Sequence, residues 1–130
     1  MKKILIVEDN EMNLKLIRTV LKAKGFVLAE ARDGEEALKI VVAERPDIIL
    51  IDIQIPKVDG LEVTRRIRAM DDLKDKQIIA ITAHAMEGDR NKILEAGCDG
   101  YIAKPINTRT FIDEIEAILK QKAGRLKAEE

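Results

Sequence analysis

Short apolar runs alternate with longer mixed segments along the whole chain. Most runs are rich in Ile, Leu and Val and are too short for a buried helix, so each predicts a strand. The first, third and fourth runs are apolar at consecutive positions, which is typical of strands buried on both faces of a parallel sheet. The predicted strands span residues 4–7, 27–31, 48–53, 78–82 and 100–103.

The segments between these runs have the apolar spacing of helices. Leu14, Ile17 and Leu21, for example, repeat at intervals of three and four residues, which places them on one face of a helix. We expect Asn107 or Thr108 to cap the last helix, because short polar side chains bind the free N–H groups of a helix start. The later helices are predicted in residues 33–44, 63–70, 86–97 and 111–119.

Strands and helices alternate five times, which predicts an α/β fold with a parallel sheet and right-handed crossover connections. We predict a doubly wound, five-stranded sheet in the order 2-1-3-4-5. No linker, repeat or low-complexity segment divides the chain. We therefore expect one domain over residues 1–122, followed by residues 123–130 as a short polar tail or an extension of the last helix.

Composition narrows the possible functions. The 24 acidic and 23 basic residues nearly balance, so the chain lacks the positive charge that marks a nucleic-acid-binding surface. The single cysteine, Cys98, cannot form an internal disulfide, which favours a reducing compartment. The first apolar run is too short for a signal peptide or a membrane span. We predict a cytoplasmic protein that binds neither nucleic acid nor membranes.

Polar residues gather where the predicted strands end. In an open parallel sheet the carboxyl ends of the strands lie along one edge, and ligands bind there, near the switch in strand order. The second strand is an edge strand and ends without such a group, so the other four should bring their polar residues together. These residues are Glu8, Asp9, Asp52, Thr82 and Lys104.

Three carboxylates at one edge repel one another, by on the order of 4 kcal/mol for two charges about 4 Å apart at an effective dielectric of about 20. A divalent cation would remove that cost, and a small set of oxygen ligands suits Mg²⁺. Lys104 offers a positive charge and Thr82 a hydroxyl for phosphate oxygens. A buried ion pair would explain Asp52 and Lys104 alone, but the joint placement indicates an aspartate that is phosphorylated with the help of Mg²⁺.

These motifs resemble the receiver domain of two-component response regulators, over roughly residues 3–122. "ILIVEDNEMN" resembles the family's first strand with its acidic pair, and "DIILIDIQIPKVDGLEV" its phosphoacceptor strand and the loop that follows. "DGEEAL", "IIAITAH" and "GYIAKPI" resemble three further family motifs. The resemblance implies a flavodoxin-like (βα)5 fold. It also implies a phosphorylation-activated signalling switch rather than an enzyme, which promotes only its own phosphorylation and slow dephosphorylation.

The resemblance assigns roles at the acidic end of the site. It implies that Asp52 is the phosphoacceptor. It implies a Mg²⁺ site formed by Glu8, Asp9, Asp52 and the backbone carbonyl of Gln54, with Asp9 as the more direct ligand. Gln54 departs from the family, which often has Met there; because the metal would use the backbone, the departure affects the hydrolysis rate rather than the metal site.

The resemblance also assigns roles on the phosphate side. Thr82 and Lys104 match the phosphate-binding pair, and Tyr101 matches the aromatic residue that changes rotamer on activation. The Lys104–Pro105 bond is expected to be cis. His84, the sole histidine, is expected to be a residue at the rim and not the phosphodonor.

The expected phosphodonor is therefore a phosphohistidine on a partner, either a histidine kinase or a histidine phosphotransfer protein. The downstream protein target is expected on the face formed by the fourth helix, the fifth strand and the fifth helix. The identity of both partners stays open, as do the oligomeric state and the lifetime of the phosphoryl group.

Each alternative to the receiver function would require one sequence feature that this chain lacks. A phosphohydrolase of the haloacid-dehalogenase type has a second Asp two residues after its nucleophile, where this chain has Gln54. A flavin-binding module of similar topology would need a Ser-, Thr- and Gly-rich phosphate loop in place of the acidic "EDNEMN". Within the family, the start "MKKILIVEDN" and the end near residue 130 favour a free-standing receiver, while a receiver cut from a hybrid histidine kinase stays open.

Overall fold

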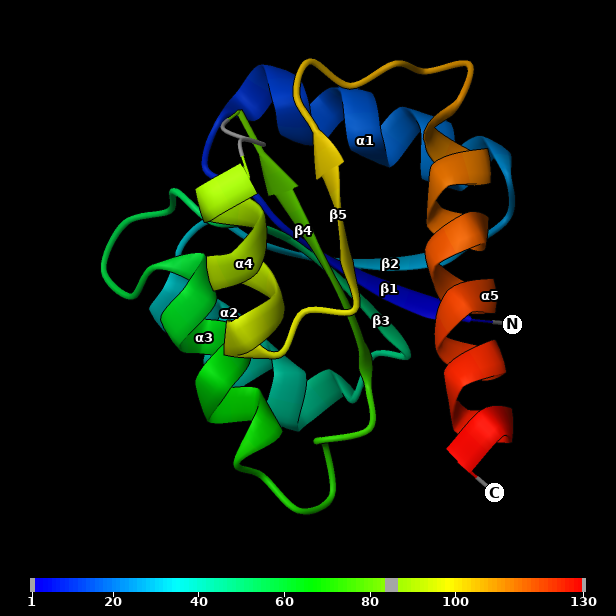
Figure 1. Ribbon diagram of the computed structural model, residues 1–130. Coiled ribbons are helices and arrows are strands. Elements are labelled where there is room, and N and C mark those ends of the chain that lie inside the picture. Colours follow the sequence, from blue (N-terminus) through cyan, green and yellow to red (C-terminus); the bar gives the residue numbers. More distant parts are fainter. Residues whose placement is uncertain (1, 84–86, 130) are drawn as a thin grey trace.

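A computed structural model describes residues 2–83 and 87–129 of the chain (Figure 1). Strands and helices alternate strictly in the part of the chain that it describes. The strands are β1 (Lys3–Val7), β2 (Val27–Ala31), β3 (Ile48–Asp52), β4 (Gln77–Thr82) and β5 (Gly100–Ala103). The helices are α1 (Glu11–Ala23), α2 (Gly34–Glu44), α3 (Gly60–Arg68), α4 (Glu87–Ala96) and α5 (Phe111–Glu129).

The five strands form one parallel sheet in the order β2-β1-β3-β4-β5. This order confirms the predicted doubly wound α/β fold, and each strand lies within one residue of its predicted bounds. The continuous apolar runs located the strands well because β1, β3 and β4 are covered on both faces. All five residues of β3, for example, are buried.

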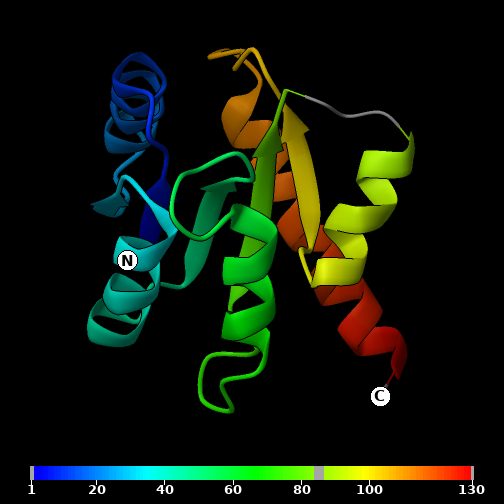
Figure 2. The same ribbon diagram turned by 90° about the vertical axis from the view of Figure 1, so that its left-hand side faces the viewer.

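Helices cover both faces of the sheet (Figure 1, Figure 2), and an apolar layer lies between the sheet and the helices on each face. Successive side chains of a strand point to opposite faces. Ile4 and Ile6 therefore pack with α1 and α5, whereas Leu5 and Val7 pack with α2, α3 and α4. The alternation fixes the register of the central strands, since a shift by one residue would exchange the two layers.

Polar side chains fix the starts of three helices. Asn10 accepts a hydrogen bond from the Asn13 N–H before α1, Asp33 accepts one from the Glu36 N–H before α2, and Asp59 caps α3. Such caps satisfy N–H groups that have no partner inside the helix. They also anchor these helix starts near the carboxyl edge of the sheet, where the preceding strands end.

Asn107, one of the two predicted caps, holds the turn that leads into α5. The helix begins at Phe111, the first apolar residue of the predicted helix. The N–H groups of Thr110 and Phe111 both donate to the Asn107 carbonyl, and the Asn107 side chain accepts from the Arg109 N–H. At its other end α5 runs to Glu129. None of the described helices is long and apolar enough to cross a membrane.

Candidate functional site

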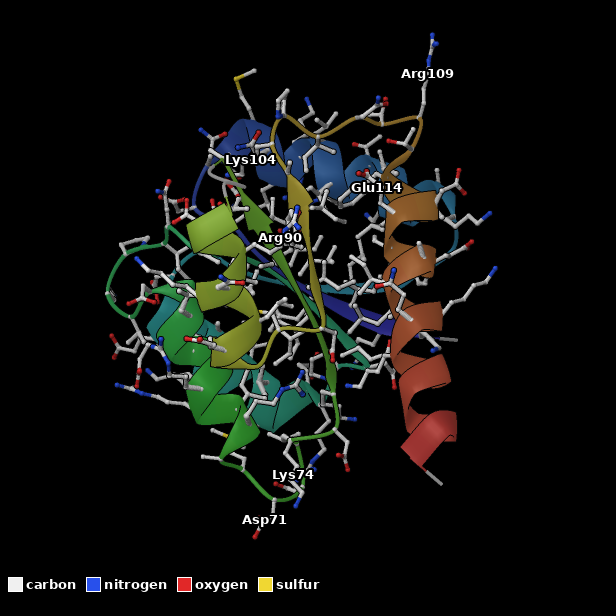
Figure 3. The ribbon with its side chains drawn as sticks, in the orientation of Figure 1. Asp71, Lys74, Arg90, Lys104, Arg109 and Glu114 are labelled. Atoms are coloured by element: carbon white, nitrogen blue, oxygen red, sulfur yellow. The ribbon has the colours of Figure 1, made fainter. Side chains whose placement is uncertain are left out.

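The carboxyl ends of β1, β3, β4 and β5 bring the predicted site residues to one edge of the sheet. Asp52 ends β3 and pairs in register with Ile81, next to Thr82 at the end of β4. The Lys104 N–H donates to the Thr82 carbonyl at 2.8 Å, which fixes the chain directly after β5. Figure 3 shows Lys104 at this edge and Lys74 at the opposite end of the molecule.

Three carboxylates meet at this edge. One oxygen from each of Glu8, Asp9 and Asp52 lies within 4.8 Å of the others. Glu8 and Asp52 are buried, at 0% and 4% exposure, while Asp9 is exposed. Oε2 of Glu8 is buried and makes no hydrogen bond within the described residues. A buried carboxylate oxygen without a partner is costly, so the arrangement fits a divalent cation.

Lys104 joins two of these carboxylates. Its Nζ donates to Oδ2 of Asp52 at 2.7 Å and to Oε1 of Glu8 at 3.4 Å. Burial alone would lower the pKa of Lys104, but the hydrogen bonds and charges of Asp52 and Glu8 outweigh it and raise this pKa. The ammonium group therefore stays charged and can neutralise Asp52 or an anionic group bound to it.

Burial, together with the nearby Asp52 carboxylate, raises the pKa of Glu8 to about 7. Lys104 and Asn13 act against this rise, by charge and by hydrogen bond respectively. The pKa of Glu8 rises because burial and a neighbouring carboxylate both disfavour its charged form.

The backbone after Asp52 is held close to its carboxylate. The Gln54 N–H donates to Oδ1 of Asp52 at 2.9 Å, and the Gly60 N–H donates to the Ile53 carbonyl at 3.1 Å. A Cβ at Gly60 would lie 2.6 Å from the Asp52 carbonyl oxygen and from the Ile53 Cα. Only glycine therefore lets the start of α3 pack against the end of β3. The sequence pattern did not reveal this contact.

The loop between β3 and α3 packs on the start of α2. The Gly34 N–H donates to the Pro56 carbonyl at 3.2 Å, and a Cβ at Gly34 would lie 1.8 Å from the Val58 carbonyl oxygen. Lys57 adopts a left-handed φ of 71° and pairs with Asp33 at 3.6 Å. The sequence pattern had identified "DGEEAL" as a family motif. The structure shows that its glycine, Gly34, allows the β3–α3 loop to pack closely on the start of α2.

The predicted switch residues lie on β4 and β5. Thr82 is fully buried at the end of β4. Tyr101 on β5 is partly buried, and its hydroxyl accepts a hydrogen bond from Arg90 Nε of α4 at 3.0 Å. The Arg90 guanidinium carbon lies 5.4 Å from the centre of the Tyr101 ring, and Figure 3 shows Arg90 between α4 and β5. Tyr101 thus contacts α4 in this state.

Two further expectations concern single positions. The Lys104–Pro105 bond is cis. His84 lies outside the described residues, so its expected place at the rim stays a prediction.

The family model for the response regulator receiver domain matches residues 4–116. The chain therefore belongs to the response regulator receiver family. This membership confirms the predicted class, a phosphorylation-activated signalling switch, and favours neither the phosphohydrolase nor the flavin-binding alternative. Members of the family interact with histidine kinases or phosphotransfer proteins and with downstream targets.

Individual relatives agree with this class. The polar-differentiation response regulator DivK of Brucella anthropi is 47% identical over 118 residues, which are 91% of this chain and 96% of DivK. Among solved structures, the chemotaxis response regulator CheY4 of Vibrio cholerae matches with a TM-score of 0.87 at 25% identity, over 91% of this chain and 98% of CheY4.

A third relative was solved with a metal ion. The receiver domain of the sensor histidine kinase PA1611 from Pseudomonas aeruginosa has a magnesium ion coordinated in its active site cleft. It matches with a TM-score of 0.80 at 38% identity, over 92% of this chain and 95% of that domain. In this chain, Glu8, Asp9 and Asp52 form the group of described carboxylates that could hold a metal ion.

Proposed function

We propose that Asp52 accepts a phosphoryl group from a phosphohistidine of a histidine kinase or a histidine phosphotransfer protein. The observation that carries this proposal is the pairing of Asp52 with Lys104 beside Glu8, whose second oxygen is buried without a hydrogen bond among the described residues. An ion pair alone would not need that second carboxylate, whereas a metal-assisted phosphoacceptor does.

The metal site in this proposal takes Mg²⁺. Its ligands are Glu8, Asp9, Asp52 and the backbone carbonyl of Gln54. All of them offer hard oxygen atoms, and the magnesium ion in the PA1611 receiver supports the choice of ion. When bound, Mg²⁺ supplies the positive charge that lets an anionic phosphoryl donor approach three carboxylates.

The protein groups then have separate tasks. Asp52 provides the nucleophilic oxygen, and Lys104 and Thr82 hold oxygens of the transferred group by charge and hydrogen bond. Lys104 already reaches Oδ2 of Asp52, so it needs little movement to follow the new charge. We propose residues 1–122 as the receiver domain and the rest of α5 as its extension.

A small acyl phosphate tests the proposal without a partner. Acetyl phosphate with Mg²⁺ should add one phosphoryl group to the protein, detected by intact mass. EDTA should abolish the adduct because Asp9 and Glu8 then lack the metal. Asp52→Asn should abolish it too, since an amide is not a nucleophile. Equal labelling of parent and Asp52→Asn would refute the assignment.

The phosphoryl group adds a charge of about −1.5 to −2 and three acceptor oxygens. We propose that Thr82 is drawn toward these oxygens and that Tyr101 turns inward behind it. That turn would break the contact between Tyr101 and Arg90 and reshape the face of α4, β5 and α5, where we place the downstream target. A hollow of about 490 Å³ lies on this face, and its lining includes Arg90, Tyr101 and Ile118.

Tyr101 is a clean reporter for this switch, because the chain has one Tyr and no Trp. With Mg²⁺ and beryllofluoride as a mimic of the phosphoryl group, acrylamide quenching of Tyr101 fluorescence should decrease as the ring turns inward. Thr82→Ala should still accept phosphate from acetyl phosphate but lose this response. An unchanged response in Thr82→Ala, or none in the parent, would contradict the switching mechanism.

A further inference from the structure

Glu8 receives all its hydrogen bonds on one of its two oxygens. Within the described residues, Oε1 accepts from the Asn10 N–H at 3.3 Å, from Asn13 Nδ2 at 3.3 Å and from Lys104 Nζ at 3.4 Å. Oε2 accepts none of them and is buried. Three donors on one side fix the rotation of the carboxylate and leave a defined oxygen for another ligand.

The three donors are not equivalent. The Asn10 N–H belongs to the backbone at the cap of α1. Lys104 is closer to Asp52, at 2.7 Å against 3.4 Å for Glu8, and its charge will follow any phosphoryl group placed on Asp52. Within the described residues, the Asn13 amide is therefore the side-chain donor of Glu8 that Asp52 does not share.

The helix start holds Asn13 in place. Its own backbone N–H donates to the Asn10 side chain at 3.0 Å, so the first turn of α1 is fixed against the loop that follows β1. Asn13 is partly buried, and its amide nitrogen donates to Glu8 Oε1 at 3.3 Å. A neutral amide gives this hydrogen bond without adding a charge next to the metal ligands.

We propose that Asn13 is a positioning residue for the metal site. Its amide turns the Glu8 carboxylate so that Oε2 faces the cation, or a water bound to the cation. This inference rests on the proposed function, because it requires the acidic cluster to bind a divalent ion. Hydrogen bonds that orient a ligand from outside the coordination sphere typically change metal affinity by about 10- to 100-fold when they are removed.

Calorimetric titration of the full chain with MgCl₂ tests this role without phosphorylation. Asn13→Ala should bind Mg²⁺ about tenfold more weakly than the parent, at the lower end of that range. Asn91→Ala is the matched control, because it makes the same truncation on an exposed site of α4 and should leave the affinity unchanged. Ala favours a helix more than Asn does, so the fold should survive the change.

A second measurement separates positioning from a structural role. Thermal melts in EDTA should give the same midpoint for Asn13→Ala and the parent, or a slightly higher one for the variant. An Mg²⁺ affinity of Asn13→Ala equal to that of the parent would overturn the inference and leave the proposed function intact. A parent that binds no Mg²⁺ would overturn both. A loss of affinity matched by a loss of EDTA stability would assign Asn13 to the fold and overturn the positioning role.

Discussion

Asp52 shows how a carboxylate is accommodated at the end of a buried strand. Its oxygens have separate partners, the Gln54 N–H on one and the Lys104 ammonium on the other. A buried carboxylate without such partners would be strongly destabilising. The sequence predicted Asp52 beside Lys104 because both follow strands of one parallel sheet. It did not predict Gly60 or Asn13, because their contacts with the site depend on distances between packed elements.

The buried thiol of Cys98 predicts that the stability of the fold depends on pH in the alkaline range. Burial raises the pKa of its thiol from 9.0 to about 11, and its Sγ lies 3.6 Å from the Thr64 hydroxyl. The raised pKa means that the folded protein prefers the protonated thiol. The stability that this preference contributes is complete below about pH 9 and is lost as the pH rises toward about 11.

Iodoacetamide labelling followed by mass spectrometry measures this directly. The folded protein should react slowly with iodoacetamide at pH 7 and only slightly faster at pH 9. The urea-unfolded protein should react readily, and faster as the pH approaches 9. Rapid labelling of the folded protein at pH 8 would show that Cys98 is neither buried nor protonated as described.

At the scale of elements, one arginine joins the end of α3 to the segments around β4 and β5. Arg68 Nη1 donates to the carbonyls of Lys74 and Lys76, at 2.6 and 2.5 Å, and its Nε donates to the Gly97 carbonyl at 2.8 Å. Its Nη2 donates to Asp99 Oδ2 at 3.0 Å. Arg68 thereby fixes the C-terminal end of α4 at the edge of the sheet opposite the proposed phosphorylation site.

This clamp predicts a large difference between two arginines of the same helix. Arg68→Met should lower the free energy of unfolding by about 1–3 kcal/mol, because the carbonyls of Lys74 and Gly97 lose this charged donor. Asp99 and the Lys76 carbonyl still accept from Lys122. Arg66→Met is the control, since Arg66 is exposed and, within the described residues, pairs with Glu62, a pair worth about 0.3–0.5 kcal/mol. Urea unfolding of both variants measures the difference. Similar losses in the two variants would mean that Arg68 is no clamp.

The sequence predicted the bounds of those helices and strands that are set by the spacing of apolar residues. The strands are buried runs, so their limits follow from the sequence within one residue. The last helix begins at its first apolar residue, Phe111, and the turn before it closes onto Asn107, one of the two predicted caps. Arg68, in contrast, gave no sequence signal, since a charged residue on an amphipathic helix usually faces solvent.

At the scale of the whole molecule, the topology assembles the site. Residues far apart in the chain converge because the carboxyl ends of parallel strands share one edge. This rule, applied to the sequence, was enough to predict which strands contribute. The elements that support the rim, such as the α2 start beneath the β3–α3 loop, required the packed structure, because only there do Gly34 and Val58 meet.

The same assembly predicts that overall stability depends on Mg²⁺. Three carboxylates share one positive Lys104 at this edge, so Mg²⁺ should raise the melting temperature. The gain should be about 1.4 kcal/mol for each tenfold of metal above its dissociation constant. Asp9→Asn should lose this gain and melt at a higher temperature than the parent in EDTA. Melting curves of the parent that coincide in EDTA and in Mg²⁺ would exclude a metal site at this edge.

The most direct measurement of the central claim locates the phosphoryl group itself. Borohydride reduces an aspartyl phosphate to homoserine, which peptide mass spectrometry assigns to a single position. After treatment with acetyl phosphate, we predict homoserine at position 52, formed with Mg²⁺ and not with EDTA. Homoserine at position 9 or at another acidic residue, or none at position 52 with Mg²⁺ present, would contradict the assignment of Asp52 as the phosphoacceptor.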